Sequence, residues 1–166
     1  MVGRYARLVF AIIVRLVPNE MDAQELTQDT FLRAFRHIGS YDADKASLST
    51  WLCRIAYRLT LDFLKRRQPV VVSMEDSEVW QTDISNALLE AGLSTGREER
   101  IRQLEKLMDE LPADERMLLN LYYFDNCPLA EIGYIMDVNA GALANRLHRI
   151  RKKLYRKLIE NERNEL

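Results

Sequence analysis

The sequence predicts an all-α protein: two small helical domains joined by an acidic linker. Apolar residues recur at helical spacing along most of the chain, and Gly (6) and Pro (4) are too few for a many-turned β-sandwich. The 166 residues allow one large domain or two small ones, and the periodicity is lost between residues 69 and 96. We therefore expect helical domains at residues 1–68 and 97–160, each large enough to build a core.

Three helices are predicted in the first domain. The apolar run 8–14 is shorter than the roughly twenty residues that span a bilayer, so it predicts a buried helix. Asp22 and Glu25 have the form of a capping box, which predicts a second helix that ends at Gly39 and buries Phe31, Ala34, Phe35 and Ile38. After a polar loop, the third helix should stop before Pro69 and bury Leu48, Trp51, Leu52, Ile55, Leu59 and Phe63.

Charge is distributed unevenly along a chain whose net charge is only -1. Residues 1–68 carry 11 basic and 7 acidic side chains, whereas residues 69–100 carry 2 basic and 7 acidic ones. The segment 69–96 is thus predicted to be an acidic linker with a short helix around residues 86–91. A solvated tether without further function is the alternative.

The second domain is predicted to hold four helices. The first should bury Ile101, Leu104, Leu107, Met108 and Leu111 and end at Pro112, and the next should bury Met117, Leu118, Leu121 and Tyr122. A short helix initiated by Pro128 carries Leu129, Ile132 and Met136. Asn139 is the predicted N-cap of the last helix, which should bury Leu143, Leu147, Ile150, Leu154 and Leu158.

Segments 128–136 and 140–157 have helix-turn-helix proportions, because a three-residue turn joins them. The polar side of the second helix displays Gly141, Asn145, His148, Arg149, Lys152 and Arg156. Along this helix, small and polar side chains come first and cationic ones follow. This order suits a helix whose amino-terminal end enters the major groove and whose later turns contact phosphates. Asn145 is suited to a base edge, Arg149 to guanine or phosphate, and Lys152 to salt-dependent affinity. An ordinary solvated basic helix is the alternative.

The third helix of the first domain presents a second candidate DNA surface. Thr50, Arg54 and Tyr57 are predicted to face away from the apolar side, with Arg58 on the flank. An exposed tyrosine among arginines suits stacked bases and a phosphate backbone, although Tyr57 packing on another helix is equally compatible with the pattern. The preceding loop carries Asp42 and Asp44 but lacks the later Gly and Glu of a calcium-binding loop.

No catalytic site or cofactor is predicted. No nucleophile, base and orienting group assemble from these residues, and there is no phosphate-binding loop. Cys53 and Cys127 lack metal-binding spacing, so we expect a reduced, cytoplasmic protein with inert thiols, no metal and no small-molecule substrate. On the second helix, Glu25, Asp29, Arg33 and Arg36 project outward and either solvate the helix or dock a protein.

These residues resemble the sigma-70 family, specifically the extracytoplasmic-function (ECF) sigma factors of bacterial RNA polymerase. The resemblance is carried by the stretches 22–35, 41–56 and 62–67 in the first domain and by 111–116, 130–132 and 145–154 in the second. Arg58 stands where the family often has Asn, and Asp137 where Gly often makes the turn. Ala142 and Ala144 stand where Thr and Lys are common.

The resemblance implies three contact surfaces. The first domain becomes sigma region 2, with a polymerase-binding face made of Glu25, Gln28, Asp29, Leu32, Arg33 and Arg36. Its −10 reader would comprise Tyr41, Asp42, Lys45, Ser47, Thr50, Trp51, Arg54, Tyr57 and Arg58. The second domain becomes region 4, whose −35 reader would comprise Asn139, Ala140, Gly141, Ala144, Asn145, His148, Arg149, Lys152 and Arg156. The linker would thread the channel of polymerase through which RNA leaves.

The resemblance also implies a non-catalytic promoter-specificity subunit whose partners are core RNA polymerase and promoter DNA, as −35 duplex and −10 single strand. An anti-sigma factor, expected to be membrane-anchored, would hold it inactive, and Leu61 and Leu64 are predicted to be exposed for such a helical partner. The alternative function is a stand-alone helix-turn-helix regulator with a helical partner-binding domain.

Overall fold

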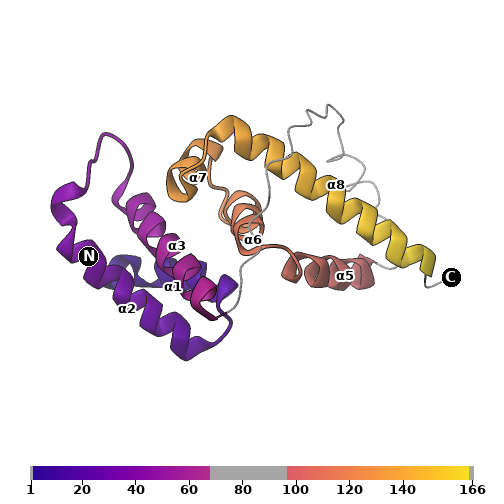
Figure 1. The fold of residues 1–166 in the computed structure, drawn as a ribbon, viewed down its shortest axis with the longest axis horizontal. Coiled ribbons are helices and arrows are strands. Elements are labelled where there is room, and N and C mark those ends of the chain that lie inside the picture. The colour runs from indigo at the N-terminus through magenta and orange to yellow at the C-terminus, as the bar shows by residue number, and fades with distance from the viewer. Residues whose placement is uncertain (1, 68–96, 165–166) are drawn as a thin grey trace.

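Helices make up all the regular structure in the described part of the chain, residues 2–67 and 97–164 of a computed structural model (Figure 1). The first range forms an amino-terminal unit and the second a carboxyl-terminal unit, as the all-α prediction requires. The acidic linker and its predicted short helix lie outside the described residues.

The amino-terminal unit is built from α1 (Val2–Leu16), α2 (Glu20–Arg36) and α3 (Leu48–Arg67), each of which packs against the other two. A single turn of 3-10 helix, η1 (Ile38–Ser40), follows α2. Ile13, Leu16 and Leu52 are among the largest side chains that are completely buried. The apolar run 8–14 thus lies in a core helix, as predicted.

The start of α2 differs from the capping box predicted at Asp22. Asn19 is the N-cap, because its side-chain oxygen accepts a hydrogen bond from the backbone N–H of Asp22 at 3.1 Å. The helix ends at Arg36 rather than at Gly39, and the buried side is formed by Ala23, Leu26, Thr30, Phe31 and Ala34. Phe35 and Ile38 were predicted to be buried and are instead 50% and 45% exposed.

The buried side of α3 is wider than the single apolar stripe that the sequence predicts. Thr50, Trp51, Leu52, Cys53, Ala56, Tyr57 and Thr60 are buried, whereas Leu48, Ile55, Leu59 and Phe63 are only half-buried. Leu61 and Leu64, predicted to be exposed, are half-buried against the core. The cause is that α3 packs against α1 and α2 on one side and against the carboxyl-terminal unit on the other.

The carboxyl-terminal unit is ordered around its longest helix, α8 (Ala140–Asn164). Against it pack α5 (Arg97–Asp109), α6 (Ala113–Leu119) and α7 (Leu129–Met136). The turn η2 (Asn120–Phe124) continues α6 with π-helical hydrogen bonding. Leu143, Leu147, Ile150 and Leu154 are buried as predicted, Leu158 is half-buried, and α8 runs beyond the predicted domain end at residue 160. Ile101, predicted to be buried, is 46% exposed.

A tight turn joins α7 to α8 and fixes the helix-turn-helix. Asp137 ends α7 in the left-handed conformation, with φ 59° and ψ 47°. The backbone comes so close here that a Cβ on Gly133 would lie 2.6 Å from the carbonyl oxygen of Val138. Asn139 caps α8 as predicted, since its side-chain oxygen accepts a hydrogen bond from the N–H of Gly141 at 2.8 Å.

The two units touch along α3 and α7, with a smaller contact between α1 and α6 (Figure 1). Buried side chains of both units belong to one continuous set of contacts. The domain boundaries at residues 68, 96 and 160 stay predictions. Among the described helices, none is long and apolar enough to cross a membrane.

Candidate nucleic-acid and polymerase interfaces

The loop before α3 is held by its own polar side chains. The Ser47 hydroxyl accepts a hydrogen bond from the N–H of Thr50 at 3.3 Å, which satisfies an amide at the start of the helix. Asp42 accepts from the N–H of Asp44 at 2.9 Å, and the Tyr41 hydroxyl donates to the carbonyl of Ala46 at 3.2 Å. Lys45 and Ser47 are exposed, so the loop presents these two side chains of the predicted −10 surface to solvent.

Three predicted −10 residues face inward in this structure. Thr50, Trp51 and Tyr57 are 6%, 6% and 5% exposed, so the expectation of an exposed tyrosine among arginines is wrong. Tyr41 lies against Trp51 with ring centroids 5.3 Å apart, and burial raises the pKa of Tyr57 far above its ordinary value. The alternative for Tyr57, packing on another helix, is what the structure has.

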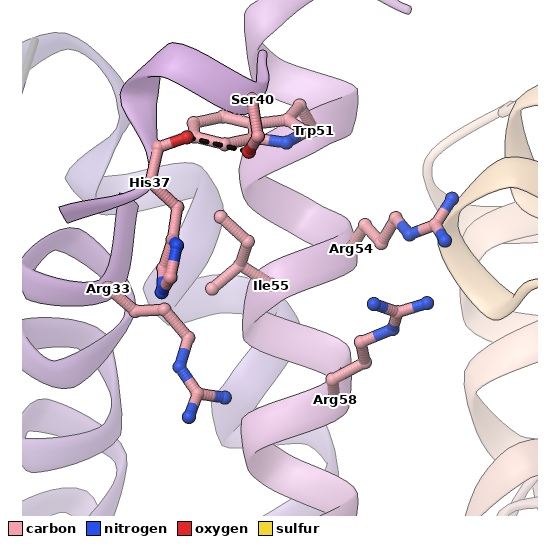
Figure 2. A pocket seen from close by; sticks show the side chains of 7 residues that line it. All are labelled: Arg33, His37, Ser40, Trp51, Arg54, Ile55 and Arg58. Carbon is pink, nitrogen blue, oxygen red and sulfur yellow. Dashed lines mark hydrogen bonds between the residues drawn. The ribbon is translucent and has the colours of Figure 1, made fainter. Parts of the chain in front are cut away.

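A basic pocket of about 260 Å³ lies between α2 and α3 (Figure 2). Its lining holds three arginines and one histidine and no acidic side chain; the residues are Arg33, His37, Ser40, Trp51, Arg54, Ile55 and Arg58. Arg33 lies on α2 and His37 directly follows its last residue, whereas Arg54 and Arg58 enter from α3. A pocket with this charge favours an anion such as a phosphate.

The two arginines of α3 point from this pocket toward the carboxyl-terminal unit (Figure 2). The Arg54 guanidinium lies 4.7 Å from the centre of the Tyr134 ring and donates a hydrogen bond to the Tyr134 carbonyl at 3.2 Å. One Asp137 carboxylate oxygen lies 3.7 Å from Arg54 and the other lies 3.6 Å from Arg58. Predicted DNA contacts of one unit are therefore paired with the helix-turn-helix of the other.

The predicted polymerase face of α2 is exposed along its whole length. Glu25, Gln28, Asp29, Leu32, Arg33 and Arg36 are all exposed. Beside them runs an open groove of about 680 Å³ between α1 and α2, lined in part by Phe10, Phe31, Leu32 and Phe35. Leu32 is 55% exposed, so the face combines charged side chains with an apolar stripe.

The predicted −35 face of α8 is most open at its amino-terminal end. Asn139, Ala140, Gly141, Ala144 and Asn145 are exposed, as is Arg156 further along. His148, Arg149 and Lys152 are half-buried rather than fully exposed. The order of small and polar groups followed by cations is therefore present on one face of α8.

Other basic residues of α8 hold the carboxyl-terminal unit together. Arg146 pairs with the buried Asp114 at 3.9 Å, and Lys153 pairs with Glu115 at 4.0 Å. Arg151 donates to the Tyr123 hydroxyl and lies over the Tyr122 ring. Part of the basic segment therefore fastens α8 to the rest of the unit.

Sequence reasoning missed His37, Tyr134 and Asp137 as parts of these surfaces. His37 lies four positions after Arg33, a spacing that places both on one helix side and could have indicated the pocket. Tyr134 and Asp137 are about eighty positions from Arg54, and no local pattern signals a contact over that separation. Among the described residues no cluster of His, Cys, Asp and Glu could hold a metal ion.

Two helical units, one with an exposed helix-turn-helix and the other with a basic pocket, define a helical DNA-binding protein. Residues 1–70 match Sigma-70 region 2, and residues 101–154 match Sigma-70, region 4. The chain is 30% identical to the ECF RNA polymerase sigma factor SigW of Bacillus subtilis, over 93% of this chain and 84% of that one. It is 29% identical to the ECF RNA polymerase sigma-E factor of Escherichia coli, over 95% of this chain and 84% of the relative.

A solved structure has the same fold. It is the sigma factor RpoE of Bartonella quintana in complex with the anti-sigma factor NepR, with a TM-score of 0.63 at 16% identity over 96% of this chain and 94% of that chain. The chain belongs to the sigma-70 family, as an ECF RNA polymerase sigma factor. It initiates transcription and is not an enzyme, and of the two predicted functions the sigma factor is confirmed rather than the stand-alone regulator.

Proposed function

We propose that this sigma factor recruits core RNA polymerase through α2, reads the −35 element with α8 and reads the −10 element with the start of α3 and the loop before it. The observation that carries the proposal is the exposed first part of α8, where small residues flank Asn145 directly after the capped turn that follows α7. A recognition helix works in this way when its amino-terminal residues meet base edges and its later turns meet phosphates.

At the −35 element, Asn145 is the proposed base reader. Its side chain is exposed on the second turn of α8, and an amide can pair with adenine in the major groove. Gly141 and Ala144 beside it are small, which lets the helix approach the groove floor. Arg149, Lys152 and Arg156 follow on later turns, where they would contact phosphates and supply salt-dependent affinity.

At the −10 element, we assign the direct contacts to Lys45, Ser47, Arg54 and Arg58, with Tyr41 and Asp42 shaping the loop. Arg54 and Arg58 line the basic pocket, and Lys45 and Ser47 are exposed in the loop before α3. Thr50, Trp51 and Tyr57 would support the surface from within. Melting the −10 element exposes unstacked bases, and a site that holds a flipped base offsets an unstacking cost of a few kcal/mol.

For polymerase binding, the proposed contact is the exposed face of α2 that includes Asp29. Its charged side chains surround an apolar stripe at Leu32, and such a combination suits a stable protein interface. Asp29→Arg should abolish binding to core polymerase and leave the circular dichroism spectrum unchanged. Glu105→Arg, the same charge reversal on the exposed side of α5, should bind core polymerase normally. Equal loss in both variants would contradict the assignment.

Run-off transcription with purified core polymerase and genomic DNA fragments tests the proposal as a whole. The chain should produce transcripts that core polymerase alone does not, and the absence of new transcripts from every fragment would contradict it. On a template that responds, Asn145→Ala should change sequence preference, whereas Lys152→Ala should weaken binding about equally for all sequences and reduce the salt dependence. The reverse pattern would show that the two roles are exchanged.

We also propose that the chain acts in the cytoplasm and is held inactive by a membrane-anchored anti-sigma factor. The likeness to a sigma factor solved with an anti-sigma factor supports such a partner. Detergent extracts of the source cell's membranes should suppress run-off transcription in a dose-dependent way, and the soluble fraction should not. Suppression by the soluble fraction alone would contradict membrane anchoring, and no suppression by either fraction would contradict the partner.

A further inference from the structure

The pairing of Arg54 and Arg58 with Asp137 joins two surfaces that the proposed function uses for different parts of the promoter. Arg54 and Arg58 are four positions apart on α3, so their guanidinium groups emerge on the same side of the helix. Both point toward the carboxyl-terminal unit (Figure 2). The two oxygens of the Asp137 carboxylate, in the turn between α7 and α8, lie 3.7 Å from Arg54 and 3.6 Å from Arg58. A carboxylate held between two guanidinium groups occupies the position that a phosphate takes in nucleic-acid complexes.

We propose that Arg54 and Arg58 form one anion site that Asp137 fills from within the chain and that a backbone phosphate of single-stranded DNA fills in its place. Asp137 and a phosphate cannot occupy the site together. The turn between α7 and α8 therefore blocks binding of DNA to Arg54 and Arg58 until the two units separate. This inference rests on the proposed −10 role of the two arginines.

The surroundings of the site fit an anion. The adjoining pocket adds Arg33 and His37, and its lining contains no acidic side chain, so Asp137 is the carboxylate that offsets this positive group from across the interface. Ser40 and Trp51 complete the lining, but the Ser40 hydroxyl donates to the His37 carbonyl at 2.7 Å and Trp51 is only 6% exposed. The basic side chains therefore carry the attraction, as in the positively charged grooves that follow the backbone of single-stranded nucleic acid.

The two arginines differ in how firmly the carboxyl-terminal unit holds them. The Arg54 side chain is 24% exposed, and it stacks on the Tyr134 ring and bonds the Tyr134 carbonyl besides facing Asp137. The Arg58 side chain is 51% exposed and pairs with Asp137 at 3.6 Å. A phosphate can therefore reach Arg58 first, and it must move α7 off α3 to reach Arg54.

Asp137 can be changed without disturbing its backbone. Its φ of 59° lies in the left-handed region, which Asn adopts at least as readily as Asp. Asp137→Asn therefore removes the charge and keeps the turn. Glu110→Gln is the matched control, because it removes one negative charge from an exposed ion pair with Lys157, inside the carboxyl-terminal unit.

The test measures binding of the full chain to a fluorescein-labelled oligothymidylate by anisotropy at low salt. Asp137→Asn should bind the oligonucleotide about three- to tenfold more tightly than the unmodified chain. The two arginines then no longer pair with a carboxylate that competes with the phosphate. Glu110→Gln should bind like the unmodified chain. In a background with Arg54→Ala and Arg58→Ala, binding should be weak and Asp137→Asn should add nothing.

Three results would overturn the inference: equal affinity of Asp137→Asn and the unmodified chain, an equal gain from Glu110→Gln, or a gain that survives without the two arginines. Hydrogen exchange gives a second readout, since the oligonucleotide should speed exchange in α7 of the unmodified chain as that helix leaves α3. Binding with unchanged exchange in α7 would also overturn it. If the doubly substituted background binds DNA and transcribes normally, it is the proposed −10 role that fails.

Discussion

The Arg15 guanidinium donates two hydrogen bonds to the Asp125 carboxylate, at 2.6 Å and 3.2 Å, across 110 positions of sequence. Arg15 lies in the last turn of α1, and Asp125 directly follows η2. The same guanidinium lies 5.9 Å from the centre of the Phe124 ring. This pair ties the two units together at a second place, in addition to the contact between α3 and α7.

Asp125→Asn should loosen the contact between the units and cost little stability. The two side chains are 30% and 28% exposed, so the pair is worth about 0.5–1 kcal/mol at low salt and less at high salt. Urea denaturation at two salt concentrations measures the difference. Glu99→Gln, which breaks an exposed pair within α5, should change stability less. If the loss of stability in Asp125→Asn is as large in 1 M salt as at low salt, the pair does not stabilise the protein through charge attraction.

Gly133→Ala should damage the helix-turn-helix. The added Cβ would meet the Val138 carbonyl oxygen at 2.6 Å, so the turn between α7 and α8 must shift, at a cost of about 1–3 kcal/mol. Thermal denaturation and binding to −35 duplex should both be weakened. Gly39→Ala is the control, because nothing lies within 4 Å of the Cβ that it adds. Equal behaviour of the two variants would refute the steric argument.

The two thiols should react slowly in the folded protein. Burial raises the pKa of Cys53 to about 12, and burial together with the hydrogen bond to Glu131 raises that of Cys127 to about 12. Only the thiolate attacks, so alkylation by iodoacetamide at pH 8 should be about a hundredfold slower than in the urea-unfolded chain. Mass spectrometry follows each site. Rapid labelling of either folded thiol at pH 8 would contradict the prediction.

Glu115→Gln should alter how stability depends on pH. Burial raises the pKa of Glu115 above its ordinary value of 4.5, although Lys153 lies 4.0 Å away and acts in the opposite direction. A carboxyl with a raised pKa in the folded state binds its proton more tightly there than in the unfolded chain. Its stabilising contribution is therefore complete below pH 4.5 and is lost as the pH rises through the folded value.

The side chain in Glu115→Gln stays neutral at every pH, so this variant should not lose stability at position 115 as the pH rises. Relative to the unmodified chain, its free energy of unfolding should rise from acid pH to pH 7, by under about 1 kcal/mol because solvent screens a half-buried group. Urea denaturation at both pH values measures this. Glu110→Gln, at an exposed pair, should keep the pH dependence of the unmodified chain. If the free energy of unfolding of Glu115→Gln instead fell, relative to the unmodified chain, between acid pH and pH 7, the prediction would be wrong.

The sequence predicts best where a helix packs on one side only. The stripe Leu143, Leu147, Ile150 and Leu154 is buried as its spacing predicts, since the rest of α8 faces outward or meets polar partners. The Asn139 cap was predictable for a similar reason: an N-cap interacts with residues next to it in sequence. The order of the described helices follows from such local signals.

Prediction fails where burial depends on distant parts of the chain. For Tyr57 the pattern left exposure and packing on another helix equally open, and the residue is buried because α3 is covered from two sides, only one of which shows in its apolar pattern. Phe35 has the spacing of a core residue and is half-exposed beside an open groove. The pairs of Asp137 with Arg54 and Arg58 join two units, and neither helix alone gives a sign of them.

The length of α8 has a mechanical consequence. Its 25 residues span about 37 Å, and its far end is fastened to the start of α5 by Arg100 and Glu162, 2.7 Å apart. The end that would enter the groove and the end tied to α5 therefore belong to one stiff rod, which rests on α6 through Arg146 and Asp114. A shift of α5 would therefore be passed along this rod to the end that carries the proposed −35 contacts.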